Sequence, residues 1–173
     1  MRIAVGCDLQ ESERYYKKLA QDKEWQGTFG FTEELDTRWE QVLVENPSLL
    51  LVWRKNDEII GHAIWHETST DEHRTGDPRD REDRETLRKL CGGKTGNIVE
   101  LHEIWLRKPH RGKGYGEKFF EFFEEFVRKQ DYAAIIYYAD HPAAISICRK
   151  RGWNEDFLTK EKWRVFCFSL STE

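Results

Sequence analysis

Long apolar runs are absent from this 173-residue sequence, and neither sign of charge dominates it. No segment approaches the roughly 18 consecutive apolar residues that a membrane-spanning helix needs. The N-terminal residues also lack the apolar core of a secretory signal. We therefore expect a cytoplasmic protein that does not enter a membrane. Charged residues make up 35% of the chain but leave a net charge of only −4. This near balance disfavours nucleic acid as a partner, because nucleic-acid-binding domains are usually strongly basic.

Cysteine is scarce and scattered. The four cysteines form neither a C-x-x-C pair nor the spacing of a zinc site: Cys7, Cys91, Cys148 and Cys167. We therefore expect no metal site, and we interpret at least three of these residues as buried free thiols in a reducing compartment. The length is sufficient for one hydrophobic core of its own. We accordingly expect a single domain over residues 1–173.

The most informative part of the chain lies between residues 99 and 123. Residues 99–106 mix β-branched, aromatic and polar side chains, as half-buried strands do. Pro109 ends this predicted strand, and three glycines then occupy alternate positions: Gly112, Gly114 and Gly116. Apolar residues follow at the spacing of a helix with one buried face: Phe119, Phe122, Phe123, Phe126 and Val127. The segment predicts a strand, a tight glycine turn and a helix.

A glycine turn that opens a helix suits a phosphate group, because the first N–H groups of a helix lack intrahelical acceptors and its dipole is positive there. Arg111 and Lys113 add positive charge. The spacing excludes a P-loop, which needs G-x-x-x-x-G-K-[ST]. It also excludes the dinucleotide fingerprint G-x-G-x-x-G, since the last interval here is one residue short.

The turn resembles the R/Q-x-x-G-x-G/A motif of the GNAT superfamily of acyl-CoA N-acyltransferases, with Arg111, Gly114 and Gly116 at its fixed positions. Residues 100–106 resemble the E-L-x-x-L-Y-V form that often precedes this motif in the family. Strand, turn and helix therefore match the family together.

A second resemblance lies further along the chain. Family members often carry N-x-x-A-x-x-x-Y-x-x-x-G-F after their fifth strand, and Ala144, Gly152 and Trp153 match its alanine, glycine and aromatic positions. Two residues depart from the pattern. His141 stands at the asparagine position, and Cys148 stands at the tyrosine position.

The resemblance implies an α/β fold of one GNAT-type domain. Its central mixed, mostly antiparallel sheet would have six or seven strands with helices on both faces. Its fourth and fifth strands would splay around acyl-CoA. It further implies transfer of an acetyl group from acetyl-CoA, as cosubstrate and without a metal, to a primary amine by direct attack on the thioester. A homodimer is common in the superfamily.

The resemblance also implies a set of cofactor-binding residues. The pantetheine arm would bond to exposed backbone of the fourth strand, at Ile104, Trp105 and Leu106. The pyrophosphate would be held by the loop residues Arg111, Gly112, Lys113, Gly114, Tyr115 and Gly116. His141 would contact the cofactor from the asparagine position.

An acceptor amine must lose its proton before it can attack, because an alkyl ammonium has a pKa of about 10.4. A carboxylate or an imidazole is the expected proton acceptor. Glu100 is our first choice, since some family members have an acidic base at this position. His102 is the second, on the same face of the strand, and Glu103 points to the other face. His62 and His66 are interpreted as structural or surface residues.

The proton donor to the departing thiolate is less defined. Cys148 replaces the tyrosine that would reach the sulfur of coenzyme A in the family. A thiol with a reference pKa near about 8.5 can donate a proton, but Cys148 also fits the interpretation of a small core residue. Tyr137, Tyr138 or water remain alternatives.

Other elements complete the prediction. We expect helices over residues 11–25 and from Thr32, an aromatic loop over residues 27–31 whose Phe29 and Phe31 line an acceptor pocket, and a hairpin over residues 48–66. A charged insertion at about residues 69–97 forms either a lid or a surface excursion, with a short helix that ends at Gly92. A non-catalytic acyl-CoA-binding domain is the alternative to an enzyme.

Overall fold

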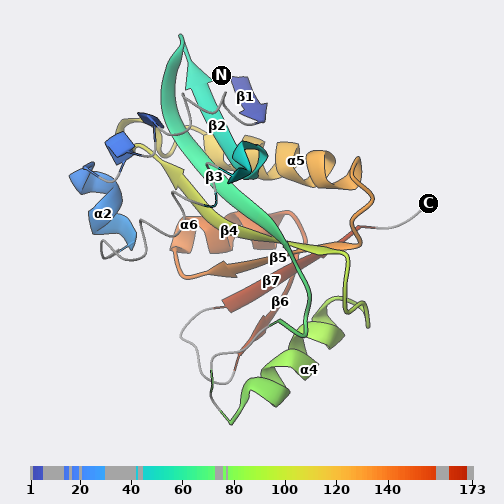
Figure 1. The fold of residues 1–173 in the computed structure, drawn as a ribbon. Coiled ribbons are helices and arrows are strands. Elements are labelled where there is room, and N and C mark those ends of the chain that lie inside the picture. The colour runs from blue at the N-terminus through green and yellow to red at the C-terminus, as the bar shows by residue number, and fades with distance from the viewer. Residues whose placement is uncertain are drawn as a thin grey trace. The chain divides into compact units, whose positions relative to one another are not determined.

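The computed structural model describes residues 2–5, 14–15, 17–19, 21–29, 42, 45–72, 76, 78–158 and 164–170. The chain divides into two compact units, one made of Met1–Ile64 and Glu103–Gly112 and the other of Trp65–His102 and Lys113–Glu173. Strands β3 (Glu58–Thr68) and β4 (Ile98–Leu106), both labelled in Figure 1, each have residues in both units. Within the part of the chain that is described, no helix is long and apolar enough to cross a membrane.

The first unit contains the strand order β1-β2-β3-β4. Strands β1 (Arg2–Val5) and β2 (Leu50–Lys55) are antiparallel, as are β2 and β3. Asn56 and Asp57 join β2 to β3 with φ of 51° and 64°. A two-residue loop with both central residues at positive φ has the twist that a hairpin requires, so the predicted hairpin is confirmed. A 3-10 helix (Pro47–Leu49) precedes β2 where we expected the strand to begin.

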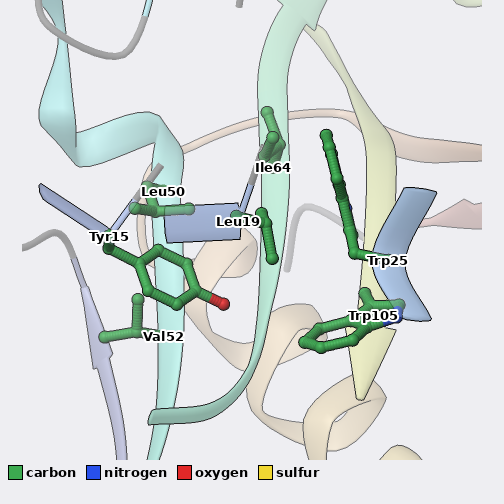
Figure 2. Close-up of a cluster of buried hydrophobic side chains, with 7 residues drawn as sticks. All are labelled: Tyr15, Leu19, Trp25, Leu50, Val52, Ile64 and Trp105. Carbon is green, nitrogen blue, oxygen red and sulfur yellow. The ribbon is translucent and has the colours of Figure 1, made fainter. Parts of the chain in front are cut away.

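One hydrophobic cluster forms the core of the first unit. Three of its seven buried side chains come from helical residues, and the other four come from strands β2, β3 and β4. Figure 2 shows all seven: Tyr15, Leu19, Trp25, Leu50, Val52, Ile64 and Trp105. This cluster is a main source of stability for the first unit, because burying one large apolar side chain contributes about 1.5–3 kcal/mol to the free energy of unfolding.

The helix predicted over residues 11–25 is wrong in its extent. Residues 14–15 and 17–19 are helical, but the chain turns at Gln21, and helix α2 (Lys23–Phe29) begins anew. Asp22 causes this restart, because its Oδ1 accepts hydrogen bonds from the backbone N–H groups of Glu24 (2.9 Å) and Trp25 (3.3 Å). A side chain that caps first-turn N–H groups in this way starts a helix. Residues 27–29, predicted as loop, are therefore helical. Phe31 and the start of the helix expected from Thr32 lie outside the described residues.

The second unit contains the strand order β3-β4-β5-β7-β6. Strand β5 (Ala134–Ala139) is parallel to β4, with a register that joins Ile98–Glu100 to Ala134–Ile136. Strand β7 (Arg164–Ser169) is antiparallel to β5, and β6 (Asn154–Phe157) is antiparallel to β7. The predicted mixed, mostly antiparallel sheet is thus confirmed, and its parallel pair is short, as strands that diverge require.

Helices pack on both faces of the sheet in the second unit. On one face, α4 (Asp80–Leu90) places Leu87 against Leu158 and Val165. On the other, α5 (Tyr115–Arg128) places Phe120 against Tyr137 with ring centroids 5.8 Å apart. The insertion at residues 69–97 therefore carries the predicted helix, and this helix is part of the core.

Helix α6 (Pro142–Lys150) is joined to α5 by a buried carboxylate. Glu124 of α5 accepts two hydrogen bonds from the Arg151 guanidinium (2.7 and 2.6 Å) and one from the Trp153 indole (2.8 Å). A paired and fully hydrogen-bonded carboxylate can be buried without a large penalty. This network fixes the C-terminal end of α6 against the second half of α5.

Candidate active site

Three titratable side chains meet on β3 and β4 of the second unit. His66 comes from β3, and Glu100 and His102 come from β4. The Glu100 Oε2 lies 3.5 Å from His66 Nε2, and its Oε1 lies 3.2 Å from His102 Nδ1. The side chains are 30%, 18% and 30% exposed in the order His66, Glu100 and His102. We call this group the open cluster, because all three side chains are partly exposed to solvent.

The hydrogen bonds of the open cluster define where protons reside. His66 Nδ1 lies 2.8 Å from the backbone oxygen of Glu67, and because a carbonyl only accepts, Nδ1 carries a proton. Any hydrogen bond from Nε2 to Glu100 then requires the doubly protonated, cationic ring. Burial lowers the pKa of His66, but the hydrogen bond and the negative charge of Glu100 outweigh it, so its pKa is raised above 6.5.

Glu100 is strongly acidic in this setting. Burial alone would raise its pKa, but hydrogen bonds from His102 and His66 and the charges of both rings lower it to about 2. Glu100 therefore stays ionised at neutral pH and cannot itself hold a proton there. Its effect is to stabilise a positive charge on the adjacent imidazoles, which makes a histidine the better proton acceptor of the cluster.

The donor atoms of the open cluster lie within 4.8 Å of one another. Two imidazoles and a carboxylate are groups that zinc accepts in proteins. Here, however, hydrogen bonds between the three side chains already use these atoms.

A second group, which we call the buried cluster, occupies the first unit. His62 Nδ1 lies 2.9 Å from the Tyr15 hydroxyl, and His62 Nε2 lies 2.5 Å from Glu103 Oε1. The same Oε1 accepts a hydrogen bond of 2.7 Å from the Trp25 indole. His62 and Trp25 are fully buried, and Glu103 is 4% exposed. His62 thus lies between the Tyr15 hydroxyl and Glu103, with one ring nitrogen at hydrogen-bond distance from each.

The glycine turn has left-handed backbone at two of its glycines and leads directly into helix α5. Gly112 and Gly114 have φ of 70° and 76°, values that side-chain-bearing residues rarely adopt. Gly114 is the N-cap of α5, which is 14 residues long. A Cβ built on Gly116 would lie 3.0 Å from the Ile147 side chain, so this glycine permits close packing of α5 against α6. A helix that starts at so open a turn presents its first N–H groups and the positive end of its dipole to an anion.

A family model matches a part of the chain that includes the glycine turn and both clusters. The model of the Acetyltransferase (GNAT) family matches residues 13–153. The chain belongs to this family. It is therefore an N-acetyltransferase that uses acetyl-CoA, and GNAT enzymes need no metal. The predicted family membership and cosubstrate are confirmed. A search of curated proteins found no match.

Solved structures show that the GNAT fold extends over nearly the whole chain. Drosophila melanogaster polyamine N-acetyltransferase, which forms N-acetylagmatine, has a TM-score of 0.68 at 11% identity, over 98% of this chain and 100% of its own. Thermoplasma acidophilum PaiA N-acetyltransferase, solved with coenzyme A, has a TM-score of 0.62 at 13% identity, over 98% and 99%. A putative acetyltransferase of Salmonella typhimurium, solved with acetyl-CoA, has a TM-score of 0.58 at 14% identity, over 100% and 95%.

The structure places the predicted GNAT loop residues in different surroundings. Lys113 is exposed, whereas the Arg111 guanidinium donates to the Leu106 carbonyl (2.6 Å) and pairs with Glu24 (3.3 Å). Arg111 thus holds the chain that leads into the turn. Leu106, one of three backbone positions predicted to bond the pantetheine arm, has its carbonyl occupied by this contact.

The other two predicted backbone positions adjoin β3. A Cβ built on Gly61 would lie 2.5 Å from the Trp105 oxygen, so β3 and β4 approach closely there. The Trp105 side chain is buried in the core of the first unit, and Ile104 is half-buried. Only glycine at position 61 allows this packing beside the predicted cofactor strand.

Two residues at GNAT motif positions have local structural roles. His141 is the N-cap of α6, and its Nδ1 accepts a hydrogen bond of 3.2 Å from Ala143 N–H. Cys148 is fully buried in α6. Burial and the nearby charge of Glu124 raise the pKa of its thiol to about 12. Their predicted roles at the cofactor and in catalysis stay predictions.

Sequence reasoning found two members of the open cluster and missed the third. The period-two pattern placed Glu100 and His102 on one face, and the alternating burial along β4 agrees. His66 was interpreted as structural or surface, because its position opposite Glu100 depends on the pairing of β3 with β4. A histidine near the end of a strand beside the motif strand was the only signal available.

Proposed function

We propose that this GNAT enzyme transfers the acetyl group of acetyl-CoA to a primary amine, and that the open cluster accepts the proton of that amine. The observation that carries the assignment is the ionised Glu100 between two half-exposed imidazoles. The acceptor class is supported by the resemblance in fold to a polyamine N-acetyltransferase.

Proton removal is the first task of these residues. An alkyl ammonium has a pKa of about 10.4, so at neutral pH nearly all of the acceptor is protonated. The neutral imidazole of His66 or His102 takes the proton, directly or through a water molecule, and Glu100 stabilises the imidazolium that results. In this proposal an imidazole is the base and the Glu100 carboxylate stabilises its charged form. The sequence had instead suggested Glu100 itself as the base.

The glycine turn supports the second task, which is to hold acetyl-CoA. Gly112, Gly114 and the first turn of α5 would bind the pyrophosphate, with Lys113 adding positive charge. Acetyl-CoA supplies the thioester, whose carbonyl would be polarised by a backbone N–H of β4, as is usual for acyl transfer.

The thiolate of coenzyme A leaves without help from Cys148 in this proposal. A thiol with a pKa of about 12 is a weaker acid than an ordinary thiol, whose pKa is near about 8.5. It would therefore keep its own proton. Water completes the protonation, and Cys148 serves as a small core residue.

The experiment that tests the function is an acceptor screen. The protein is incubated with acetyl-CoA and a panel of primary amines that includes agmatine, polyamines and arylalkylamines, and free thiol is followed over time. We expect amine-dependent thiol release with at least one acceptor. Thermal stabilisation by coenzyme A without thiol release from any amine would instead favour a non-catalytic acyl-CoA-binding domain.

The loop assignment has its own variant. Gly114→Asp should abolish coenzyme A affinity in a calorimetric titration, because a carboxylate would face the pyrophosphate. Gly92→Asp is the matched control, since Gly92 is also exposed, has φ of 64° and has no atom within 4 Å of its would-be Cβ. Retained affinity in Gly114→Asp would show that the pyrophosphate binds elsewhere.

A further inference from the structure

Two cysteines that are far apart in sequence touch in the core of the second unit. The Cys167 thiol of β7 donates a hydrogen bond to the Cys91 sulfur, with 3.3 Å between the two sulfur atoms. Cys91 is the C-cap of α4, the helix of the charged insertion. Both residues are fully buried, with Ile98, Ala134 and Ile136 around them. Each sulfur is thus the polar partner of the other.

The two thiols differ in acidity, and the difference suits disulfide exchange. The hydrogen bond from Cys167 lowers the pKa of Cys91 against the effect of burial, and the charge of Lys94 lowers it further. The same hydrogen bond and burial raise the pKa of Cys167. Lys94 is held in place because its ammonium donates to the carbonyls of Ala133 and Leu170, each at 3.3 Å. Cys91 is therefore the nucleophile of the pair, since the thiolate is the reactive form.

Cys91 is buried, but the chain that follows it is exposed. Gly92 and Gly93 follow directly, are exposed and have positive φ, and a Cβ on either would have no atom within 4 Å. Among the described residues, none therefore crowds these two positions. Helix ends also open locally at low free-energy cost, so the last residue of α4 can be reached without global unfolding.

We propose that Cys91 and Cys167 form a reversible disulfide that ties the insertion helix α4 to strand β7. In the first step, the Cys91 thiolate attacks a low-molecular-weight disulfide and releases one thiolate, which takes up a proton. In the second, Cys167 loses its proton and attacks the mixed disulfide at Cys91, which releases the second thiol. Two protein thiols and one small disulfide thus become one protein disulfide and two small thiols.

The bond would restrict the insertion. Helix α4 is held by Leu87 against Leu158 and Val165 and by Cys91 in its own cluster. A covalent link at its C-terminal end removes the opening of that end as a low-energy motion. The chain between Cys91 and Cys167 spans 76 positions, and closing a long loop removes conformational entropy from the unfolded chain. Oxidation should therefore raise the thermal midpoint of unfolding.

The test uses the full chain in buffers of glutathione and glutathione disulfide. Intact mass should fall by two hydrogens as the disulfide fraction rises, and peptide mapping should recover a Cys91–Cys167 cross-link that dithiothreitol reverses. Cys148→Ser should form the same cross-link, whereas Cys91→Ser and Cys167→Ser should not. The oxidised wild type should unfold at a higher temperature than the reduced form, and Cys91→Ser should lose this difference.

A second comparison keeps the proposal falsifiable if the serine variants fold poorly. Oxidation of the wild type is timed in native buffer and again in urea. Faster formation of the Cys91–Cys167 cross-link in native buffer supports the proposal, because the folded chain holds the sulfurs together. Glutathione adducts alone, cross-links to other cysteines, or a rate that urea does not slow would overturn it. None of these outcomes depends on acetyl transfer, so they are separate from the test of the proposed function.

Discussion

The open and buried clusters are built from the same kinds of side chain, yet their surroundings differ sharply. Each pairs a histidine of β3 with a glutamate of β4. In the open cluster the carboxylate is 18% exposed and its imidazoles 30%, whereas in the buried cluster the imidazole is fully buried and the carboxylate is 4% exposed. The buried carboxylate also accepts from the Trp25 indole. A histidine–glutamate pair is therefore partly exposed in one place, where we propose that it exchanges protons, and an element of the core in the other.

The comparison predicts that the two glutamates differ most in their contribution to stability. Glu103→Ala leaves the His62 ring and the Trp25 indole buried without their acceptor, and each buried donor left unpaired should lower the free energy of unfolding by about 1–3 kcal/mol. Urea unfolding followed by circular dichroism measures this. Glu100→Gln is the control, and above the titration range of histidine it should cost about 1 kcal/mol or less. Equal losses in the two variants would remove the distinction between the clusters.

For kcat the order should be reversed: a change at Glu100 should have a larger effect than a change at Glu103. Glu100→Gln removes the negative charge that stabilises the imidazolium, so kcat should fall by about a hundredfold. The affinity for coenzyme A should stay unchanged, which calorimetry checks. Glu103→Gln, assayed at a temperature where it is folded, should retain kcat. A lower kcat in Glu103→Gln than in Glu100→Gln would move the proton acceptor to the buried cluster.

The open cluster should also give stability a defined pH dependence. The folded pKa of Glu100 is lowered from 4.5 to about 2, so its stabilising contribution is present above pH 4.5 and is lost as the pH falls towards 2. The folded pKa of His66 is raised, so its contribution is present below pH 6.5 and is lost as the pH rises through the folded value.

The difference in unfolding free energy between the wild type and Glu100→Gln should therefore be largest between pH 4.5 and 6.5. Its maximum should be about 1–2 kcal/mol, because partial exposure screens the pair. Urea titrations across this range test it. A difference that does not vary with pH would show that Glu100 and His66 are not coupled.

The smallest effect concerns the outer member of the buried cluster. Tyr15→Phe removes the hydroxyl that bonds to His62 Nδ1 and leaves that nitrogen without this donor. We expect a loss of about 1 kcal/mol in the free energy of unfolding and no change in kcat. Thermal unfolding and the thiol-release assay measure the two quantities. A loss of kcat without a loss of stability would make Tyr15 part of the proton pathway.

Local patterns made much of this fold predictable. The strand, glycine turn and helix from residue 98 to residue 128 follow from alternation, Pro109 and helical spacing, and β4 and α5 match the predicted bounds closely. The Asn56–Asp57 turn was likewise readable, because such residues tolerate positive φ. The resemblance to the GNAT motif then identified the cosubstrate.

Contacts between distant segments could not be predicted in this way. Alternation along β3 would place His62 and His66 on one face, yet they bond to Glu103 and Glu100, which alternation along β4 places on opposite faces. Residues 60–65 are all buried. Alternation of polar and apolar residues along β3 therefore cannot tell which face of the sheet each histidine occupies. Register, not local pattern, therefore decides which histidine joins which carboxylate.

The restart of the helix at Asp22 and the meeting of Cys91 with Cys167 were missed for related reasons. Asp22 lies within a segment whose helical spacing continues through it, so its capping bonds were not foreseen. The two cysteines are 76 positions apart, and only the packing of α4 on the sheet brings them together.

The most direct test of the central claim is the pH profile of kcat/KM for acetyl transfer to the best amine of the screen. We expect the wild type to lose activity as the pH falls through the raised pKa of His66. We expect Glu100→Gln to shift this loss to lower pH, because the imidazolium is no longer stabilised, and to lower kcat about a hundredfold. An identical profile and rate in Glu100→Gln would contradict the assignment of proton acceptance to His66, Glu100 and His102.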